Sequence, residues 1–290
     1  MESNDPGVIE FKRLISEEAP VESLLTQQFC VFLDVLGFSA YVKNGKGDEA
    51  AFLTIVESLK HARATLSLGE EKKLIKVKSF SDNIVIAVKC TGQSEHLGFF
   101  LEFISGYQMA MIEHGFFCRG GLSVGDLVID DNYIYGHALL EAYELESTKA
   151  INPMVLMSNE VIERARESQH FHVVSSIMDK QGIGYFIRID GLYYLNYLRR
   201  CFIHYQNRDE ELDCYLDYRL LDKHKQHIHQ NLADQAIGSS IYKKYAFLAR
   251  YHNEFVSRCT KYDGYHDRFI IHTIDEIVFV NKDRFRDGWD

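Results

Sequence analysis

The stretch FLDVLGFSAYV, from Phe32 to Val42, places a carboxylate and a glycine at the end of an apolar run. The run begins at Phe29, as FCVFLDV, and its nearly unbroken apolar character is typical of a strand buried on both faces. Asp34 stands where this strand ends and Gly37 follows it, so the chain is expected to turn there. Two interpretations of Asp34 remain open at this point: it caps the turn, or it binds a ligand.

The segments that follow alternate between helix and strand patterns. Amphipathic spacing predicts helices over residues 48–68, 94–114 and 136–150. Apolar runs predict strands over residues 73–80 and 83–90, joined by a turn at Ser81 and Asp82, and two more strands within FFCRGGLSVGDLVI, residues 116–129. The β-α-β-β-α-β order is that of a ferredoxin-like sandwich, an α+β fold whose open sheet face is free for a ligand or a partner.

A change of pattern divides the chain into three parts. Residues 1–28 form an N-terminal segment, and residues 29–190 hold the α+β core. Residues 191–290 are rich in tyrosine and charge, and the apolar residues have helical spacing over residues 193–231 and again over 239–256. We therefore predict a helical C-terminal part packed on the core.

Composition excludes some classes of function. The chain has 290 residues, 46% hydrophobic and 26% charged, which is enough to bury a large core. Its net charge of −10 argues against nucleic-acid binding, because phosphate-binding surfaces carry an excess of basic residues. Six cysteines without CxxC spacing indicate reduced thiols and a cytoplasmic protein. With no signal-like N-terminus and no apolar window of about eighteen residues, we expect no membrane association.

Asp34 has a candidate companion in Asp82, which lies in the predicted hairpin turn SFSDNIVIA. If the two strands are neighbours, both carboxylates reach the same end of the sheet. Two adjacent carboxylates repel each other unless a cation lies between them, and hard oxygen ligands suit Mg²⁺ or Mn²⁺. Alternatively, Ser-Asp-Asn is ordinary turn chemistry.

Two further features bear on anion binding. The glycine turn VLGFS lets the backbone approach a ligand and directs amides outward, although glycines also occur there for packing reasons. Arg119 stands in an otherwise apolar strand, in CRGGLSVGDL, where a permanent charge requires an anion. That anion is either a ligand phosphate or a structural glutamate.

The stretch HKQHIHQN presents His224, His227 and His229 at a spacing that can bind metal on a helix. No carboxylate or cysteine completes the set, and the flanking residues are polar. A solvated helix face is the simpler interpretation.

Taken together and in this order, FLDVLGFS, KSFSDNIVIA and CRGGLSVGDL resemble the class III nucleotide cyclases. That family has an Asp-x-x-Gly-Phe-(Ser/Thr) turn, a Lys-x-x-Gly-Asp hairpin and an Arg-x-Gly-Ile-x-x-Gly strand. The resemblance covers residues 29–157. Within the family, the SDN hairpin, the RGG strand and the helix GHALLEAYELE, residues 136–146, look most like the pyrimidine nucleotide cyclases of bacterial Pycsar antiphage systems.

The resemblance implies a role for each motif residue. Two divalent cations, Mn²⁺ or Mg²⁺, would be held by the side chains of Asp34 and Asp82 and the carbonyl of Val35. Phosphates would be received by Arg119 and by the amides of four consecutive residues, Leu36, Gly37, Phe38 and Ser39. Asp34, Asp82 and Arg119 would thus be the catalytic residues of a domain spanning residues 29–190.

The residues that select the base depart from the adenylate cyclase pattern. The family lysine is kept as Lys78, but the family aspartate is replaced by Tyr133. Lysine only donates hydrogen bonds, and uracil offers carbonyl acceptors, so a base-facing Lys78 would favour uracil; the alternatives for Lys78 are a phosphate contact or a surface position. The usual transition-state asparagine and arginine fall on Leu140 and Glu144. His137 and Tyr143 lie nearby, with core packing the expected role of Tyr143.

The resemblance implies cyclisation of UTP to 3′,5′-cyclic UMP and pyrophosphate, as an antiphage second messenger for a separate effector. The alternatives are a cytidylate cyclase, an adenylate cyclase, and a catalytically silent nucleotide-binding or dimerisation module. Class III sites form between two catalytic domains, which implies a homodimer.

Overall fold

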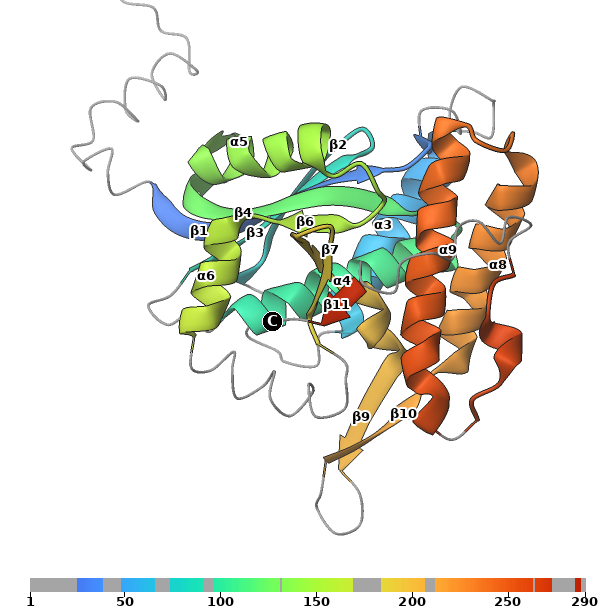
Figure 1. Cartoon of the computed structure of the whole chain (residues 1–290). Helices are drawn as coiled ribbons and strands as arrows, with labels where there is room; N and C mark the ends of the chain where they lie inside the picture. The colour runs from blue at the N-terminus through green and yellow to red at the C-terminus, as the bar shows by residue number, and fades with distance from the viewer. Residues whose placement is uncertain are drawn as a thin grey trace, which may run out of the picture.

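A mixed β-sheet forms the centre of the structure (Figure 1). The computed structural model describes residues 25–38, 48–65, 74–90, 96–130, 132–168, 184–206, 212–262, 264–272 and 285–287. Nine strands of the described residues belong to this sheet: β1 Thr26–Val35, β2 Lys76–Phe80, β3 Asn83–Lys89, β4 Cys118–Ile129, β5 Ile134–Gly136, β6 Val155–Met157, β7 Phe186–Ile189, β8 Leu192–Leu195 and β11 Phe285–Asp287.

The ferredoxin-like core is confirmed in the first half of the chain. Strands β4, β1, β3 and β2 lie in this spatial order, and each neighbouring pair is antiparallel. Helix α3 (Asp48–Thr65) connects β1 to β2, and helix α4 (His96–Glu113) connects β3 to β4. This is the predicted α+β arrangement. The last residues of the first predicted helix, 66–68, lie outside the described residues.

Strand β1 is buried on both faces, which explains its unbroken apolar sequence. Val31 and Leu33 pack in the core that contains residues of α4. Cys30 and Phe32 point the other way, toward Ala138 and Ala142 of α5 (His137–Glu144). Because side chains alternate along a strand, Asp34 belongs to the face of Phe32, the α5 face.

The prediction of two strands within residues 116–129 is wrong, since β4 is continuous from Cys118 to Ile129. Its glycines serve close packing rather than a turn. A Cβ atom on Gly121 would lie 2.2 Å from the carbonyl oxygen of Ala142 and 2.6 Å from Cβ of Leu145. The missing side chain therefore lets the end of α5 rest directly on β4.

The helical C-terminal part is present, but it begins later than its sequence pattern predicts. The described parts of the stretch over residues 193–216, which are 193–206 and 212–216, contain no α-helix: β8 extends the main sheet, η4 (Tyr197–Cys201) is a short 3₁₀ helix, and β9 (Phe202–Gln206) pairs with β10 (Leu212–Leu216). Helices α8 (Tyr218–Asp234) and α9 (Ser240–Arg258) follow.

Helices α8 and α9 stand side by side at one end of the sheet (Figure 1). Their buried side chains share a core with Phe117, which directly precedes β4. The rings of Phe117 and Tyr245 meet edge to face with centroids 5.7 Å apart. Helices α8 and α9 thus pack at the end of the sheet where β1 stops and β4 starts.

The remaining described elements are α6 (Asn159–Glu167), the π-helical turn η3 (Leu145–Lys149), and the 3₁₀ turns η5 (Cys259–Lys261) and η6 (Asp267–Phe269). Within the described ranges no helix combines the length and apolar character needed to cross a membrane. Four cysteines with described side chains are buried: Cys30, Cys118, Cys201 and Cys259.

Candidate active site

Strand register places four polar or aromatic side chains in one row across the sheet. Asp34 on β1 pairs with Arg119 on β4 and with Asn83 on β3, and Asn83 pairs with Phe80 on β2. Directly paired residues point to the same face of a sheet, so this row shares the α5 face. The row lies at the end of β1 that meets α9.

Asp34 and Asp82 lie at the same end of the sheet, because β1 and β3 are neighbours. Asp82 follows Ser81, which has a left-handed φ of 56°, in the tight turn between β2 and β3. The Val35 amide donates to the Asp82 carbonyl at 3.3 Å. Burial raises the pKa of Asp34; Arg119 opposes this rise and the Asp82 charge adds to it. The two carboxylates therefore repel each other and suit a divalent cation between them.

Arg119 lies between two carboxylates. Its Nη2 atom donates to Asp34 Oδ2 at 3.2 Å, and the same atom forms an ion pair with Glu146 Oε1. Glu146 is only 4% exposed, and burial raises its pKa while Arg119 opposes the rise. The buried Arg119 Nε has no hydrogen-bond partner among the described residues. The structural glutamate, which was the alternative to a ligand phosphate as the partner of Arg119, is thus present. The guanidinium nevertheless keeps one N–H donor for a further anion.

Glu146 reaches Arg119 because α5 continues into a π-helical turn. In this turn the Ala150 amide donates to the Leu145 carbonyl at 2.8 Å, an i to i−5 bond. The Glu146 amide nitrogen would lie 3.1 Å from a Cβ atom on Gly121. The turn therefore sits directly over β4, two positions from Arg119. No local sequence signal marks Glu146 as a partner of Arg119.

Lys244 of α9 is the second residue of the site that the sequence did not indicate. It is half-buried and interacts electrostatically with Arg119, Asp34 and Glu146. Burial lowers its pKa, Arg119 lowers it further, and the two carboxylates raise it. No motif links α9 to the first strands, so only the tertiary packing of α9 brings this ammonium group to the site.

The predicted phosphate cradle is the turn after β1, which the structure describes as far as Phe38. Gly37 has φ of 78°, a conformation that favours glycine, and a Cβ atom there would have no neighbour within 4 Å. The Leu36 amide, however, donates to the Phe117 carbonyl at 2.8 Å and is therefore occupied. Gly37 and Phe38 remain candidates for phosphate binding, and Ser39 lies outside the described residues.

Lys78 and Tyr133, the predicted base-selecting residues, both interact with a third residue, Asp130. The backbone amide of Tyr133 donates to Asp130 Oδ1 at 3.0 Å. Hydrogen bonds from Tyr133 lower the pKa of Asp130, and the Lys78 charge lowers it too. Lys78 shares the α5 face with Phe32, one row away from Asp34, since both pair with Val85. Asp130 therefore places a hydrogen-bond acceptor beside the two predicted base-selecting residues.

Leu140 and Glu144, which occupy the positions of the family's transition-state asparagine and arginine, lie on the exposed side of α5. Leu140 is 64% exposed and Tyr143 is 52% exposed. The Tyr143 ring meets Phe32 edge to face with centroids 5.3 Å apart, but the residue is not part of the core, contrary to its expected role. His137 and Glu144 are also exposed.

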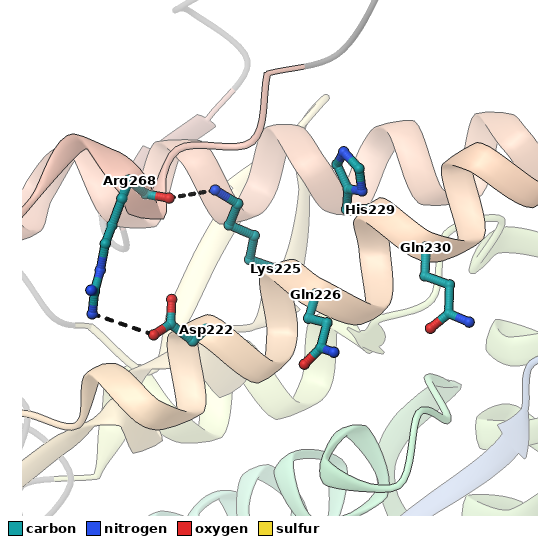
Figure 2. A pocket seen from close by; sticks show the side chains of 6 residues that line it. All are labelled: Asp222, Lys225, Gln226, His229, Gln230 and Arg268. Atoms are coloured by element: carbon teal, nitrogen blue, oxygen red, sulfur yellow. Dashed lines mark hydrogen bonds and ion pairs between the residues drawn. The ribbon is translucent and has the colours of Figure 1, made fainter.

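The three histidines of α8 do not form one site. His224 is fully buried, so the expected solvated face is wrong for this residue, and His227 is half-buried. His229 lines a shallow groove of about 590 Å³ together with Lys225 and Arg268 (Figure 2). No cluster of three or more potential metal-ligating side chains occurs in the described part of the chain.

Comparison with known proteins gives distant structural matches. No protein-family model matches the chain, and no curated protein matches it. The adenylyl cyclase CyaB from P. aeruginosa is 14% identical, with 59% of this chain and 94% of that chain covered and a TM-score of 0.38. A bacterial light-regulated adenylyl cyclase is 14% identical, with 60% and 91% covered and a TM-score of 0.40. A class III adenylyl cyclase-like ATP-binding protein from Pseudomonas aeruginosa is 12% identical, with 51% and 37% covered and a TM-score of 0.33. Similarity this low does not assign an activity.

Proposed function

We propose that this chain is a metal-dependent phosphoryl-transfer enzyme that acts on a nucleoside triphosphate. The observation that carries the proposal is the cross-strand pair of Asp34 and Arg119, with Asp82 in the adjoining turn. Carboxylates for a divalent cation and a guanidinium for phosphate thus meet at one end of a sheet, next to a glycine turn. This donor set is what transfer within a metal–triphosphate complex requires.

Within that class, we propose a nucleotide cyclase that converts UTP to 3′,5′-cyclic UMP and pyrophosphate. The motifs FLDVLGFS, KSFSDNIVIA and CRGGLSVGDL support this choice, because their key residues Asp34, Asp82 and Arg119 lie together. The product would serve as a second messenger for a separate effector, in keeping with the resemblance to the pyrimidine cyclases of antiphage systems.

Separate residues would bind the metal and the phosphates. Asp34 and Asp82, with the Val35 carbonyl, would hold Mg²⁺ or Mn²⁺. Bound there, the divalent ions would acidify the ribose 3′-hydroxyl and neutralise phosphate charge. Arg119 would leave Asp34 and turn its guanidinium, including the unpartnered Nε, toward phosphate oxygens. The left-handed turn at Gly37 would let the backbone approach the phosphates.

Base selection would rest on Lys78 and Asp130. Lys78 would donate to a uracil carbonyl, while Asp130 would accept from the neighbouring ring N–H. The same pair favours a second candidate, because an aspartate acceptor also suits the exocyclic amine of adenine or cytosine. Asp130 therefore supports an adenylate or cytidylate cyclase as the alternative to a uridylate cyclase.

A second copy of this chain would complete the site. Several large apolar side chains on and around α5 and the β2 edge are exposed: Phe80, Tyr135, Leu140, Tyr143 and Ile151, with exposed fractions from 50% to 68%. Such a set next to a candidate site supports an interface on the α5 face. A homodimer would then bring residues of the partner to the side of the site that α9 leaves open.

The proposal is tested by incubating the purified chain with each of the four nucleoside triphosphates and Mn²⁺, and identifying products by mass spectrometry. We expect cyclic UMP and pyrophosphate. Cyclic AMP or cyclic CMP as the dominant product would replace the uridylate assignment with the alternative. No cyclic product from any nucleotide, with unchanged nucleotide binding by Asp34→Ala, would identify a catalytically silent module.

A further inference from the structure

Helix α9 is distant from the site in sequence, yet it is docked on the backbone that forms the site. Tyr245 packs its ring against Phe117, and the Phe117 carbonyl accepts the Leu36 amide at 2.8 Å. Phe117 therefore links α9 to the turn that follows β1 and to the start of β4. Figure 1 shows α9 standing along this end of the sheet.

Lys244 lies at the edge of the buried face of α9. Its neighbour Lys243 is exposed, whereas Lys244 is half-buried. One turn further along the helix, Leu248 is fully buried in the core that also contains Leu145. A lysine at such an edge lays its apolar stem on the core and keeps its ammonium group at the polar rim. Here the rim holds the carboxylates of Asp34 and Glu146, with which Lys244 interacts.

The balance of charge changes when a metal binds. Without metal, the carboxylates of Asp34 and Glu146 interact with the two basic side chains of Arg119 and Lys244, and the Asp82 charge acts on Asp34. If Asp34 and Asp82 held a divalent cation, Arg119 would give up its bond to Asp34, and both basic groups would keep Glu146 as their carboxylate partner. The metal-loaded site then has an excess of positive charge, which suits a polyphosphate and no neutral ligand.

We propose that Lys244 is a polyphosphate-binding residue, contributed to the nucleotide site by the C-terminal helix of the same chain. The proposal deepens the proposed function and rests on it, since the polyphosphate is taken to be that of the substrate. Arg119 approaches from β4 and Lys244 from α9, so the two groups hold the phosphates from different sides. The C-terminal part would thereby contribute a residue to the nucleotide site, through α9.

The test measures binding of inorganic tripolyphosphate in the presence of Mn²⁺, by isothermal titration calorimetry with the full chain. Substituting Lys244→Gln is expected to weaken tripolyphosphate binding about tenfold or more, and Lys244→Arg is expected to restore most of it. Lys243→Gln, one residue away and exposed, is the matched control and is expected to change binding less than about twofold. Thermal unfolding of each variant checks that the fold is retained.

A measurement on the unmodified chain complements the variants. Acetylation of lysines, followed by mass spectrometry, should show that Mn²⁺ and tripolyphosphate protect Lys244 and leave Lys243 reactive. Unchanged tripolyphosphate affinity in Lys244→Gln, or equal losses in both variants, overturns the proposal. A rise in Mn²⁺ affinity without loss of tripolyphosphate affinity would make Lys244 a counter-ion of the empty site instead. If the unmodified chain binds tripolyphosphate but forms no cyclic nucleotide, the cyclase proposal fails while this one stands.

Discussion

Asp34 and Arg119 are direct cross-strand partners, with Arg119 Nη2 3.2 Å from Asp34 Oδ2. Their spacing is set by the hydrogen-bond register of two central strands, which contain some of the most deeply buried residues of the sheet. A carboxylate and a guanidinium placed in this way need no loop closure to meet. The candidate site is therefore preformed in its central pair, and under the proposed function a metal on Asp34 would compete with Arg119 for this carboxylate.

Substituting Asp34→Asn is expected to abolish tight Mn²⁺ binding and to lower cyclisation by at least about a hundredfold, the order seen when one charge-stabilising group is removed. The reason is that Asn keeps the shape of the side chain but not its charge. Calorimetry of Mn²⁺ binding and product formation measure the two effects. Asp126→Asn, on the outer part of β4 and hydrogen-bonded to Gln27, is the control. Equal Mn²⁺ affinity in Asp34→Asn and the unmodified chain would contradict the assignment of Asp34 as a metal ligand.

Substituting Glu146→Gln is expected to weaken Mn²⁺ binding about tenfold, or ~1.4 kcal/mol. Glu146 shares Arg119 with Asp34, so it offers the guanidinium a partner when a metal takes Asp34. Without that charge, Arg119 competes more strongly with the metal. The exposed Glu144→Gln serves as control, with little change expected. Tighter Mn²⁺ binding in Glu146→Gln would show that Glu146 does not assist release of Arg119.

Acid is expected to destabilise the C-terminal helices through His224 and His252. The His252 Nε2–H must donate to the Phe269 carbonyl at 2.8 Å, so its Nδ1 accepts from His224 Nδ1–H at 2.9 Å. His224 Nε2 then accepts from the Tyr197 hydroxyl at 2.9 Å. This chain of bonds requires a neutral His252 ring, because a further proton on its Nδ1 would place two N–H groups against each other.

The way in which the free energy of unfolding changes with pH follows from the same pair, His224 and His252. Burial lowers the pKa of His252 from 6.5 to about 4. Stability is therefore full above pH 6.5 and falls as pH drops toward 4, by on the order of 3 kcal/mol for this residue. Urea unfolding between pH 7.5 and 4.5 measures the fall. The pH dependence should be flatter in His252→Asn and unchanged in the exposed His229→Gln; an equally steep fall in His252→Asn would assign the acid sensitivity elsewhere.

Substituting Glu102→Gln is expected to lower the free energy of unfolding by about 3–5 kcal/mol, because it leaves the buried Arg199 charge without its carboxylate. The Arg199 side chain is 2% exposed and forms an ion pair with Glu102 that joins η4 to α4. Glu113→Gln, on the same helix, loses only a 3.6 Å pair with the exposed Arg219 and should cost less than about 1 kcal/mol. Similar urea midpoints for the two variants would show that burial of Arg199 does not govern the cost.

Local patterns in the sequence were sufficient to single out three residues that the structure brings together in the candidate site. Asp34 marks the end of an apolar strand, Asp82 lies in a recognisable turn, and Arg119 is a charge in an apolar strand. Each of these signals spans only a few residues. The strand order that brings them together followed from the βαββαβ pattern, and the structure has this order.

Glu146 and Lys244 were not predicted, because their positions depend on tertiary contacts. Glu146 is directed by a π-helical turn over Gly121, and Lys244 by the docking of α9 on Phe117. The burial of His224 was not predicted for a different reason: the residues next to it in the sequence are polar, so the buried stripe of the helix is hard to recognise. The stripe itself is regular in the structure, formed by Leu220, Leu221, His224 and Ile228.

The contact between Gly121 and the turn that carries Glu146 also constrains how this protein can diverge. Any side chain at position 121 would collide with the backbone of residue 142, so the residue can change only if the turn moves away. Movement of the turn would withdraw Glu146 from Arg119. Glycine at 121 and an acidic residue at 146 should therefore be retained or lost together among related sequences, and the pair can serve as a marker in searches for remote relatives of this chain.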